Sequence, residues 1–109
     1  MWDERYAGKD YLFGTEPAAF VAAQAGVLPP AARVLSLADG EGRNSVHLAG
    51  LGHRVTAMEQ APVALAKARA LAAARGVTVD FRQSGVEDWD WSQPFDAVLI
   101  DIIARKPTP

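Results

Sequence analysis

Residues 37–44 read LADGEGRN and follow a short apolar run that includes Val34 and Leu35. Two glycines separated by one residue after such a run predict a turn in which the backbone lies close to a ligand. If a helix follows, its free N–H groups favour a negatively charged group. Asp39 and Glu41 stand beside the glycines, however. The charge of this loop therefore opposes a phosphate and suits a cationic ligand.

A third acidic residue extends the pattern. Glu59 follows Gly40 by 19 positions and ends the segment RVTAME, which is typical of a strand. An acid at that spacing can accept hydrogen bonds from both hydroxyls of a ribose. Strand, glycine loop, helix, strand and acid together predict a site for an adenosine-type molecule.

Two phosphate-binding patterns fit this stretch less well. The dinucleotide fingerprint requires a third glycine, and Ser45 stands in its place. The Walker pattern requires a lysine after its last glycine, and no lysine occurs between Lys9 and Lys67. S-adenosylmethionine carries a sulfonium and an ammonium group and no phosphate, so the local charge favours it. A nicotinamide-binding half-domain stays open as an alternative from another class.

The elements that must position these residues alternate along the chain. We expect strands at residues 32–38, 54–59, 77–82 and 95–103, and helices at about 16–26, 42–50 and 62–75, the last closed by Gly76 as a left-handed cap. Such alternation predicts βαβ units, hence an α/β fold with a parallel sheet and right-handed crossovers. The residues expected to face the core are Val46, Leu48 and Leu51 on the second helix, and Val63, Ala66, Ala70, Leu71 and Ala74 on the third.

Composition narrows the class of protein. The chain has 109 residues, half of them hydrophobic, which fits one globular domain. A net charge of -2 gives no general attraction to nucleic acid or to an anionic membrane, so we expect neither as a partner. The polar N-terminus is unlike a secretory signal, no apolar stretch is long enough to span a bilayer, and there is no cysteine. A cytoplasmic location fits these features.

The sequence resembles the class I S-adenosylmethionine-dependent methyltransferases, close to the small-molecule group that includes tellurite-resistance and thiopurine methyltransferases. The motifs that carry the resemblance are WDERYAGKDYLFGTEP (2–17), VLSLADGEGRNSVHLA (34–49), VTAMEQAPVALAKARALA (55–72), FRQSGVEDWDW (81–91) and FDAVLI (95–100). The resemblance implies a Rossmann-like sheet of order 3-2-1-4. It also implies S-adenosyl-L-methionine as cofactor and a small molecule as methyl acceptor.

The family's site residues transfer to this chain by position. The resemblance implies that residues 38–42 wrap the methionine part of the cofactor, that Glu59 holds the ribose, and that residues 1–30 form a lid segment and helix before a partial methyltransferase domain at 31–109. No catalytic residue is assigned, because an in-line displacement at an activated carbon needs mainly positioning, and no metal site is expected. The implied cofactor contacts are Ala38, Asp39, Gly40, Glu41, Gly42, Glu59, Gln60 beside the adenine, Gly85 and Val86 along its edge, and the lid residues Trp2, Tyr11, Phe13 and Pro17.

Several positions depart from the family pattern. Ser36 replaces a common aspartate, Ala38 a usual glycine, and Gly85 the Asp or Asn that bonds the adenine amino group. His47 and His53 are candidate general bases, although ordinary packing or surface roles are the more frequent use of such histidines.

The family also continues after the fourth strand with three more strands. In this chain that strand is expected to be an edge strand, and an apolar edge favours pairing with a second copy in a homodimer. An inactive fragment that only binds an adenosine ligand is the alternative to an active enzyme.

Overall fold

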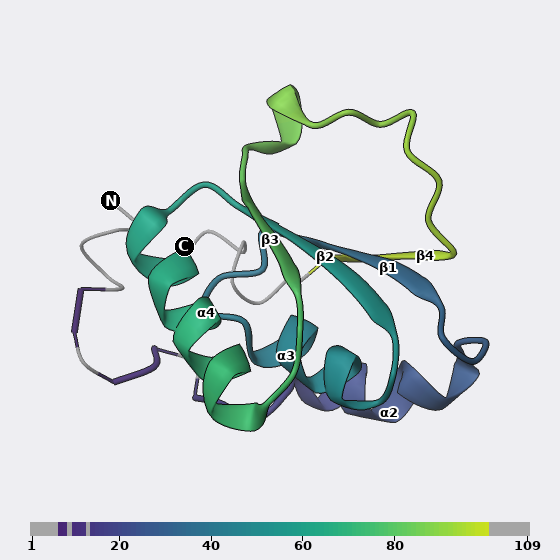
Figure 1. Ribbon diagram of the computed structural model, residues 1–109, viewed down its shortest axis with the longest axis horizontal. Coiled ribbons are helices and arrows are strands. Elements are labelled where there is room, and N and C mark those ends of the chain that lie inside the picture. The colour runs from purple at the N-terminus through teal and green to yellow at the C-terminus, as the bar shows by residue number, and fades with distance from the viewer. Residues whose placement is uncertain (1–6, 9, 13, 101–109) are drawn as a thin grey trace, which may run out of the picture.

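The computed structural model describes residues 7, 8, 10–12 and 14–100. Helices and strands alternate along the part of the chain that it describes (Figure 1). In chain order the elements are α2 (Ala19–Gln24), the 3-10 helix η1 (Ala25–Val27), β1 (Arg33–Leu37), α3 (Arg43–Gly50), β2 (Arg54–Glu59), α4 (Pro62–Arg75), β3 (Asp80–Gln83), the 3-10 helix η2 (Val86–Asp88) and β4 (Ala97–Ile100).

The four strands form one parallel sheet in the order β3-β2-β1-β4. Leu37 at the end of β1 lies opposite Met58 of β2 and Ile100 of β4, so these strands end at a common edge. The sheet therefore confirms both the predicted α/β class and the order 3-2-1-4. Among the described residues, β4 pairs on one side only, with β1.

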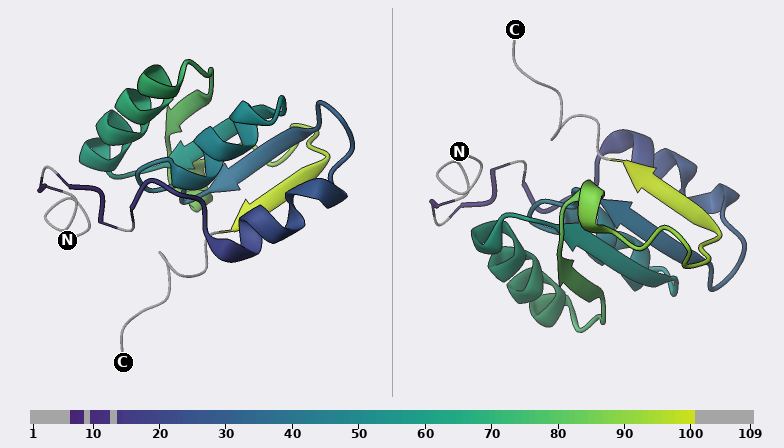
Figure 2. Two further views of the ribbon diagram at one scale, coloured as in Figure 1. Left: turned by 90° about the horizontal axis from the view of Figure 1, so that it is seen from below. Right: turned by 90° about the horizontal axis from the view of Figure 1, so that it is seen from above.

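The two faces of the sheet are covered differently (Figure 2). The view from below shows α2, α3 and α4 in front of the strands, whereas the view from above shows the segment that carries η2 crossing the other face. On that second face Trp89 and Phe95 pack against Leu35, Leu37 and Met58. Helices therefore cover one face of the sheet, and the segment that carries η2 lies over the other.

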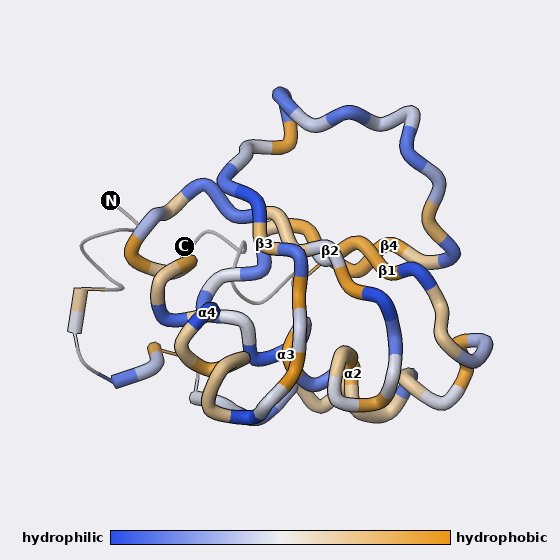
Figure 3. The backbone as a smooth tube through the Cα atoms, in the orientation of Figure 1, coloured by the Kyte–Doolittle hydropathy of each residue, from blue (hydrophilic) through white to orange (hydrophobic). Residues whose placement is uncertain are grey.

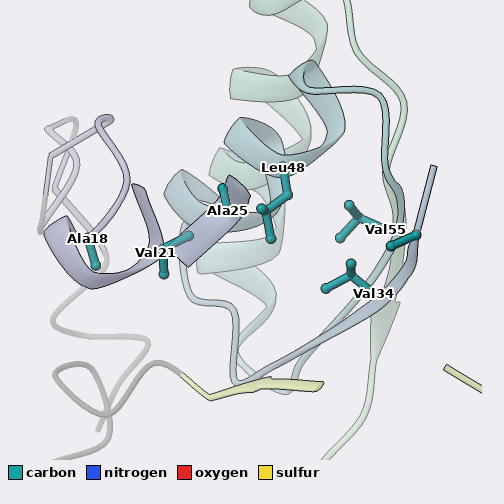
Figure 4. Packing of buried hydrophobic residues seen from close by; sticks show 7 residues of the cluster. Ala18, Val21, Ala25, Val34, Leu48 and Val55 are labelled. Carbon is teal, nitrogen blue, oxygen red and sulfur yellow. The ribbon is translucent and has the colours of Figure 1, made fainter. Parts of the chain in front are cut away.

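The main core lies between the sheet and the helices (Figure 4). Val34 of β1 and Val55 of β2 point toward Leu48 of α3, with Val21 of α2 and Ala25 of η1 beside them. Figure 3 shows hydrophobic residues along the strands and hydrophilic ones along much of the segment between β3 and β4. The helix before β1 thus packs in the same core as the sheet.

Local sequence signals explain the ends of the longest helix. Pro62 occupies the first turn of α4, where its missing N–H has no partner to lose. Gly76 closes the helix with φ 67°, in the left-handed region that glycine adopts without strain. The bounds of α4 and of β2 agree with the prediction, and so does the left-handed cap.

Other boundaries differ from the prediction. α2 begins at Ala19 and not at Glu16-Pro17, because the Ala18 N–H donates to Asn44 Oδ1 (2.8 Å) and the chain is still extended there. β3 begins at Asp80 and not at Val77, because its pairing with β2 starts only at Thr56. β4 begins at Ala97, and the expected continuation at 101–103 lies outside the described residues.

Two of the predicted helix faces are wrong in part. Val46 and Leu48 of α3 are buried, but Leu51, which directly follows the helix, is 54% exposed. Of the α4 residues expected to face the core, Leu71 is buried and Val63 is half-buried, whereas Ala66, Ala70 and Ala74 are exposed. The buried residues of α4 are Ala64, Leu65, Ala68, Leu71 and Ala72. None of the helices in the described part of the chain is long and apolar enough to span a membrane.

Candidate functional site at the carboxyl edge of the sheet

The glycine loop joins the end of β1 to the start of α3. Ala38, Gly40 and Gly42 all have positive φ, at 49°, 65° and 89°. For Ala38 this conformation costs about 1–2 kcal/mol, which explains why a glycine would suit the position. The loop is therefore a tight turn, and it follows directly on the carboxyl end of β1.

Gly42 is required by helix packing. A side chain at this position would place its Cβ 2.8 Å from the Cβ of Ala68 on α4. Because real Cβ contacts are not that short, the absence of a side chain lets α4 lie directly against the loop. On this side of the residue, the missing side chain makes room for a helix.

Glu59 holds the loop from the neighbouring strand. Its Oε1 accepts a hydrogen bond from the Gly40 N–H (2.8 Å), and its Oε2 accepts from the N–H groups of Gln60 and Ala61 (3.0 Å each). The residue is buried. An ionised carboxylate has about four acceptor positions, so roughly one stays available to a ligand hydroxyl in this arrangement.

Asp39 lies at the centre of a buried polar cluster. Its Oδ1 accepts from the Ser36 hydroxyl (2.8 Å) and its Oδ2 from the Ser45 hydroxyl (2.7 Å). Burial raises the pKa of Asp39 from 3.8 to about 6; the two serine hydrogen bonds oppose this rise, and the negative charge of Glu59 adds to it. Ser36 and Ser45, which looked like departures from sequence patterns, are the partners that hold this carboxyl group.

Glu41 is neutralised by a lysine from α4, a partner that the sequence pattern does not indicate. Its Oε2 pairs with Lys67 Nζ of α4 at 2.9 Å, and its Oε1 accepts from the Leu12 N–H at 2.6 Å. The acidic residues of the loop therefore have partners within the protein. Neither carboxylate stands free at the surface, so a cationic ligand would experience only the negative charge that these partners leave unbalanced.

Gln60 and Gly85 come together beside Glu59. A Cβ on Gly85 would lie 2.8 Å from Gln60 Oε1, so the glutamine side chain lies across this glycine. The Ser84 N–H donates to the Glu59 carbonyl (3.2 Å), which keeps the end of β3 next to the end of β2. Val86 follows at the start of η2 and is partly exposed.

The described lid residues lie on the helical side of the loop. The Tyr11 hydroxyl donates to the Lys67 carbonyl (2.8 Å), and Pro17 is half-buried one residue before the Ala18–Asn44 hydrogen bond. The expected contacts from Trp2 and Phe13 lie outside the described residues. Asn44 and Lys67, which tie the N-terminal segment down, have no signal in the sequence beyond being polar residues on helices.

His53 lies away from this edge, whereas Trp89 and Trp91 follow η2 and contact residues beside it. His53 Nδ1 accepts from the Ala32 N–H at 3.1 Å, before the strands begin. Trp89 is buried in the apolar cluster, and Trp91 is exposed and donates to the Val86 carbonyl (3.2 Å). Across the described residues, no three His, Asp or Glu side chains gather in a way that could hold a metal ion.

A parallel sheet of order 3-2-1-4 with a glycine loop after β1 and a buried acid after β2 defines an α/β domain of the adenosine-ligand type. Residues 34–106 match the methyltransferase domain family. The chain therefore belongs to that family.

Known relatives agree with this assignment. The ubiquinone biosynthesis O-methyltransferase of Xanthomonas campestris pv. campestris (strain B100) is 40% identical over 93 residues, which span 83% of this chain and 38% of the relative.

Two solved structures are similar to this chain as well. One, described for the conversion of a disulfide bond into a thioacetal group during echinomycin biosynthesis, has a TM-score of 0.77 and 32% identity, covering 92% of this chain and 45% of that chain. The RNA methyltransferase of Salinibacter ruber, solved in complex with S-adenosyl-L-homocysteine, has a TM-score of 0.69 and 27% identity, covering 77% of this chain and 57% of that one.

Proposed function

We propose that this domain binds S-adenosyl-L-methionine at the carboxyl edge of the sheet and belongs to an enzyme that transfers the methyl group to a small molecule. The observation that carries the proposal is the buried Glu59 carboxylate, placed 2.8 Å from the Gly40 N–H at the meeting of β2 and the glycine loop. Support also comes from the S-adenosyl-L-homocysteine bound by the similar Salinibacter ruber protein.

The residues present fit this cofactor. Glu59 has acceptor capacity left for a ribose hydroxyl, and the carboxyl group of Asp39 lies in the loop that would wrap the methionine part. Gln60, Gly85 and Val86 would flank the adenine, and the N-terminal residues 1–30, with Trp2, Tyr11, Phe13 and Pro17, would cover the site. When bound, the cofactor supplies an activated methyl group on a sulfonium; the chain's own part is to bind, orient and exclude water.

A small-molecule acceptor is favoured over a nucleic acid. The Xanthomonas campestris relative is named for ubiquinone biosynthesis, whereas the Salinibacter ruber protein is an RNA methyltransferase. A net charge of -2 offers no general attraction to a polyanion. We also propose a cytoplasmic location, because a chain without cysteine suits a reducing compartment.

Calorimetry with S-adenosylmethionine, S-adenosylhomocysteine and NAD tests the binding site. We expect the first two to bind and NAD not to bind. Preference for NAD would support a nicotinamide half-domain, and no binding of any of the three would refute the site. Labelled methyl transfer to a panel of thiols, oxyanions and halides then distinguishes an enzyme from a domain that only binds.

The open edge of β4 suggests an assembly. We propose that β4 pairs with a second copy of this chain. Its side chains Val98 and Ile100 are exposed, and within the described sheet β4 pairs on one side only.

A further inference from the structure

One ion pair joins three separate parts of the molecule. Glu41 belongs to the glycine loop, Lys67 to α4, and both bond to the N-terminal segment at residues 10–12. Lys67 Nζ donates to the Asp10 carbonyl (2.8 Å) as well as to Glu41 (2.9 Å), and the Leu12 N–H donates to the other oxygen of Glu41 (2.6 Å). The Tyr11 hydroxyl adds a fourth bond, to the Lys67 carbonyl (2.8 Å).

The pair is shielded from water, unlike the other ion pairs of the described chain. Its side chains are 15% exposed for Lys67 and 3% for Glu41, whereas the Arg75–Glu16 and Arg82–Asp80 pairs are largely open to solvent. Exposed pairs contribute little, but removal of one partner of a buried pair leaves an uncompensated charge. Loss of the Lys67 charge would therefore leave the buried Glu41 without its partner.

The bonded segment lies where it can affect the proposed cofactor site. Figure 2 shows the N-terminal segment running past the end of the sheet where the arrowheads of β1 and β4 lie. Glu41 is two residues from Asp39, and Gly42 touches Ala68, the residue after Lys67. A change in the pairing of Lys67 would therefore act on both the loop and the segment bonded to it.

We propose that Lys67 is a positioning residue: through its ion pair with Glu41 it fixes residues 10–12 on the glycine loop and so sets the affinity of the site. The part that concerns affinity rests on the proposed function; the part that concerns the segment does not. Tyr11 also helps to fix the segment, since its hydroxyl donates to the backbone carbonyl of Lys67.

Amide hydrogen exchange measured by NMR tests the first part without any ligand. In Lys67→Met, exchange of the Leu12 amide should rise about tenfold, since Glu41 loses the partner that orients it. Tyr11→Phe, which removes one hydrogen bond and no charge, should raise it about threefold. In Lys67→Arg, which keeps the positive charge, the Leu12 amide should exchange as slowly as in the wild type. Arg69→Met changes an exposed position on the same helix and serves as the matched control.

The reference is the Ala57 amide in the buried strand β2. Equal acceleration at Leu12 and Ala57 would mean general loss of stability and would overturn the proposal, as would an unchanged Leu12 amide in the variants that fold. If Lys67→Met does not fold, Tyr11→Phe and Lys67→Arg decide the result.

Calorimetry with S-adenosylhomocysteine tests the second part. We expect the Kd to rise about tenfold in Lys67→Met, to recover in Lys67→Arg and to stay unchanged in Arg69→Met. A Leu12 amide that exchanges faster without any change in Kd would refute the positioning role. Absence of binding by the wild-type chain would instead refute the proposed function, and the exchange measurement would still judge the role of Lys67 in fixing the segment.

Discussion

At the scale of single residues, Asp39 links folding to pH. The pKa of this buried carboxyl group is about 6, against 3.8 as its ordinary value. Between pH 3.8 and about 6, the Asp39 carboxyl group of the folded state therefore keeps a proton that the unfolded state has already released. The resulting stability is fully present below about pH 3.8 and is lost as the pH rises through 6.

Asp39→Asn should remove this pH dependence. The amide stays uncharged, and Ser45, whose hydroxyl also lies 3.3 Å from the Gly42 carbonyl, can turn its hydrogen to that oxygen and accept from the new N–H. At pH 7.5 we expect the variant to be more stable than the wild type by up to about 3 kcal/mol. Urea unfolding between pH 4 and 8 measures the difference, and parallel curves for the two proteins would contradict it.

Gly42 illustrates a second residue-scale constraint, imposed by its neighbour on α4. Gly42→Ala combines a left-handed φ of 89° with a Cβ placed 2.8 Å from Ala68, so we expect a loss of about 2–5 kcal/mol. Gly52→Ala is the matched control, because its φ is 95° and nothing lies within 4 Å. That variant should lose only about 1–2 kcal/mol. Denaturant unfolding compares them, and equal losses would show that contact with Ala68 does not matter.

At the scale of elements, α4 shows what a sequence pattern can and cannot predict. Its bounds were predictable because Pro62 and Gly76 mark them chemically. Its buried face was not, because alanine occurs all around the helix and gives no contrast between core and solvent. The face is set by what the helix packs against, namely Val46 of α3 beside Leu71 and Ala72, and the glycine loop beside Ala68, and these contacts are visible only in three dimensions.

The same reasoning applies to the candidate site. The proximity of the glycine loop and Glu59 could be predicted because their spacing along the chain reflects a repeated βαβ geometry. The roles of Ser36, Ser45 and Lys67 as partners were missed. Ser36 and Ser45 reach Asp39 only because the chain turns sharply between them, and Lys67 reaches Glu41 from a distant part of the chain. Both the start of β3 and the exposure of Leu51 depend likewise on which neighbour lies opposite.

The buried face of α4 can be tested directly. Leu65 is 1% exposed, so Leu65→Ala should lower the free energy of unfolding by about 2–5 kcal/mol. Ala66→Ser, at an adjacent position expected from sequence to be buried but exposed in the structure, should cost less than about 1 kcal/mol. Thermal and urea unfolding provide both values. The reverse ranking would restore the face that the sequence pattern predicted.

At the scale of the whole molecule, the sheet is covered unevenly. Trp89 and Phe95 shield β1 and β2 on the face opposite the helices. On β4, Val98 and Ile100 lie opposite Leu35 and Leu37 of β1, yet they are 52% and 45% exposed. Within the part of the chain that the structure describes, β4 is thus an apolar strand with exposed side chains and one unpaired edge, which favours association through that edge.

Self-association through β4 should therefore depend on these two side chains. Light scattering after size-exclusion chromatography should show a mass that rises with concentration toward a dimer. Val98→Lys should shift this rise to at least about tenfold higher concentration, because a charge on an edge strand opposes pairing. Val27→Lys is the matched control, since Val27 is 74% exposed in η1. A monomer at every concentration, or equal effects of both lysines, would show that β4 does not mediate pairing between copies.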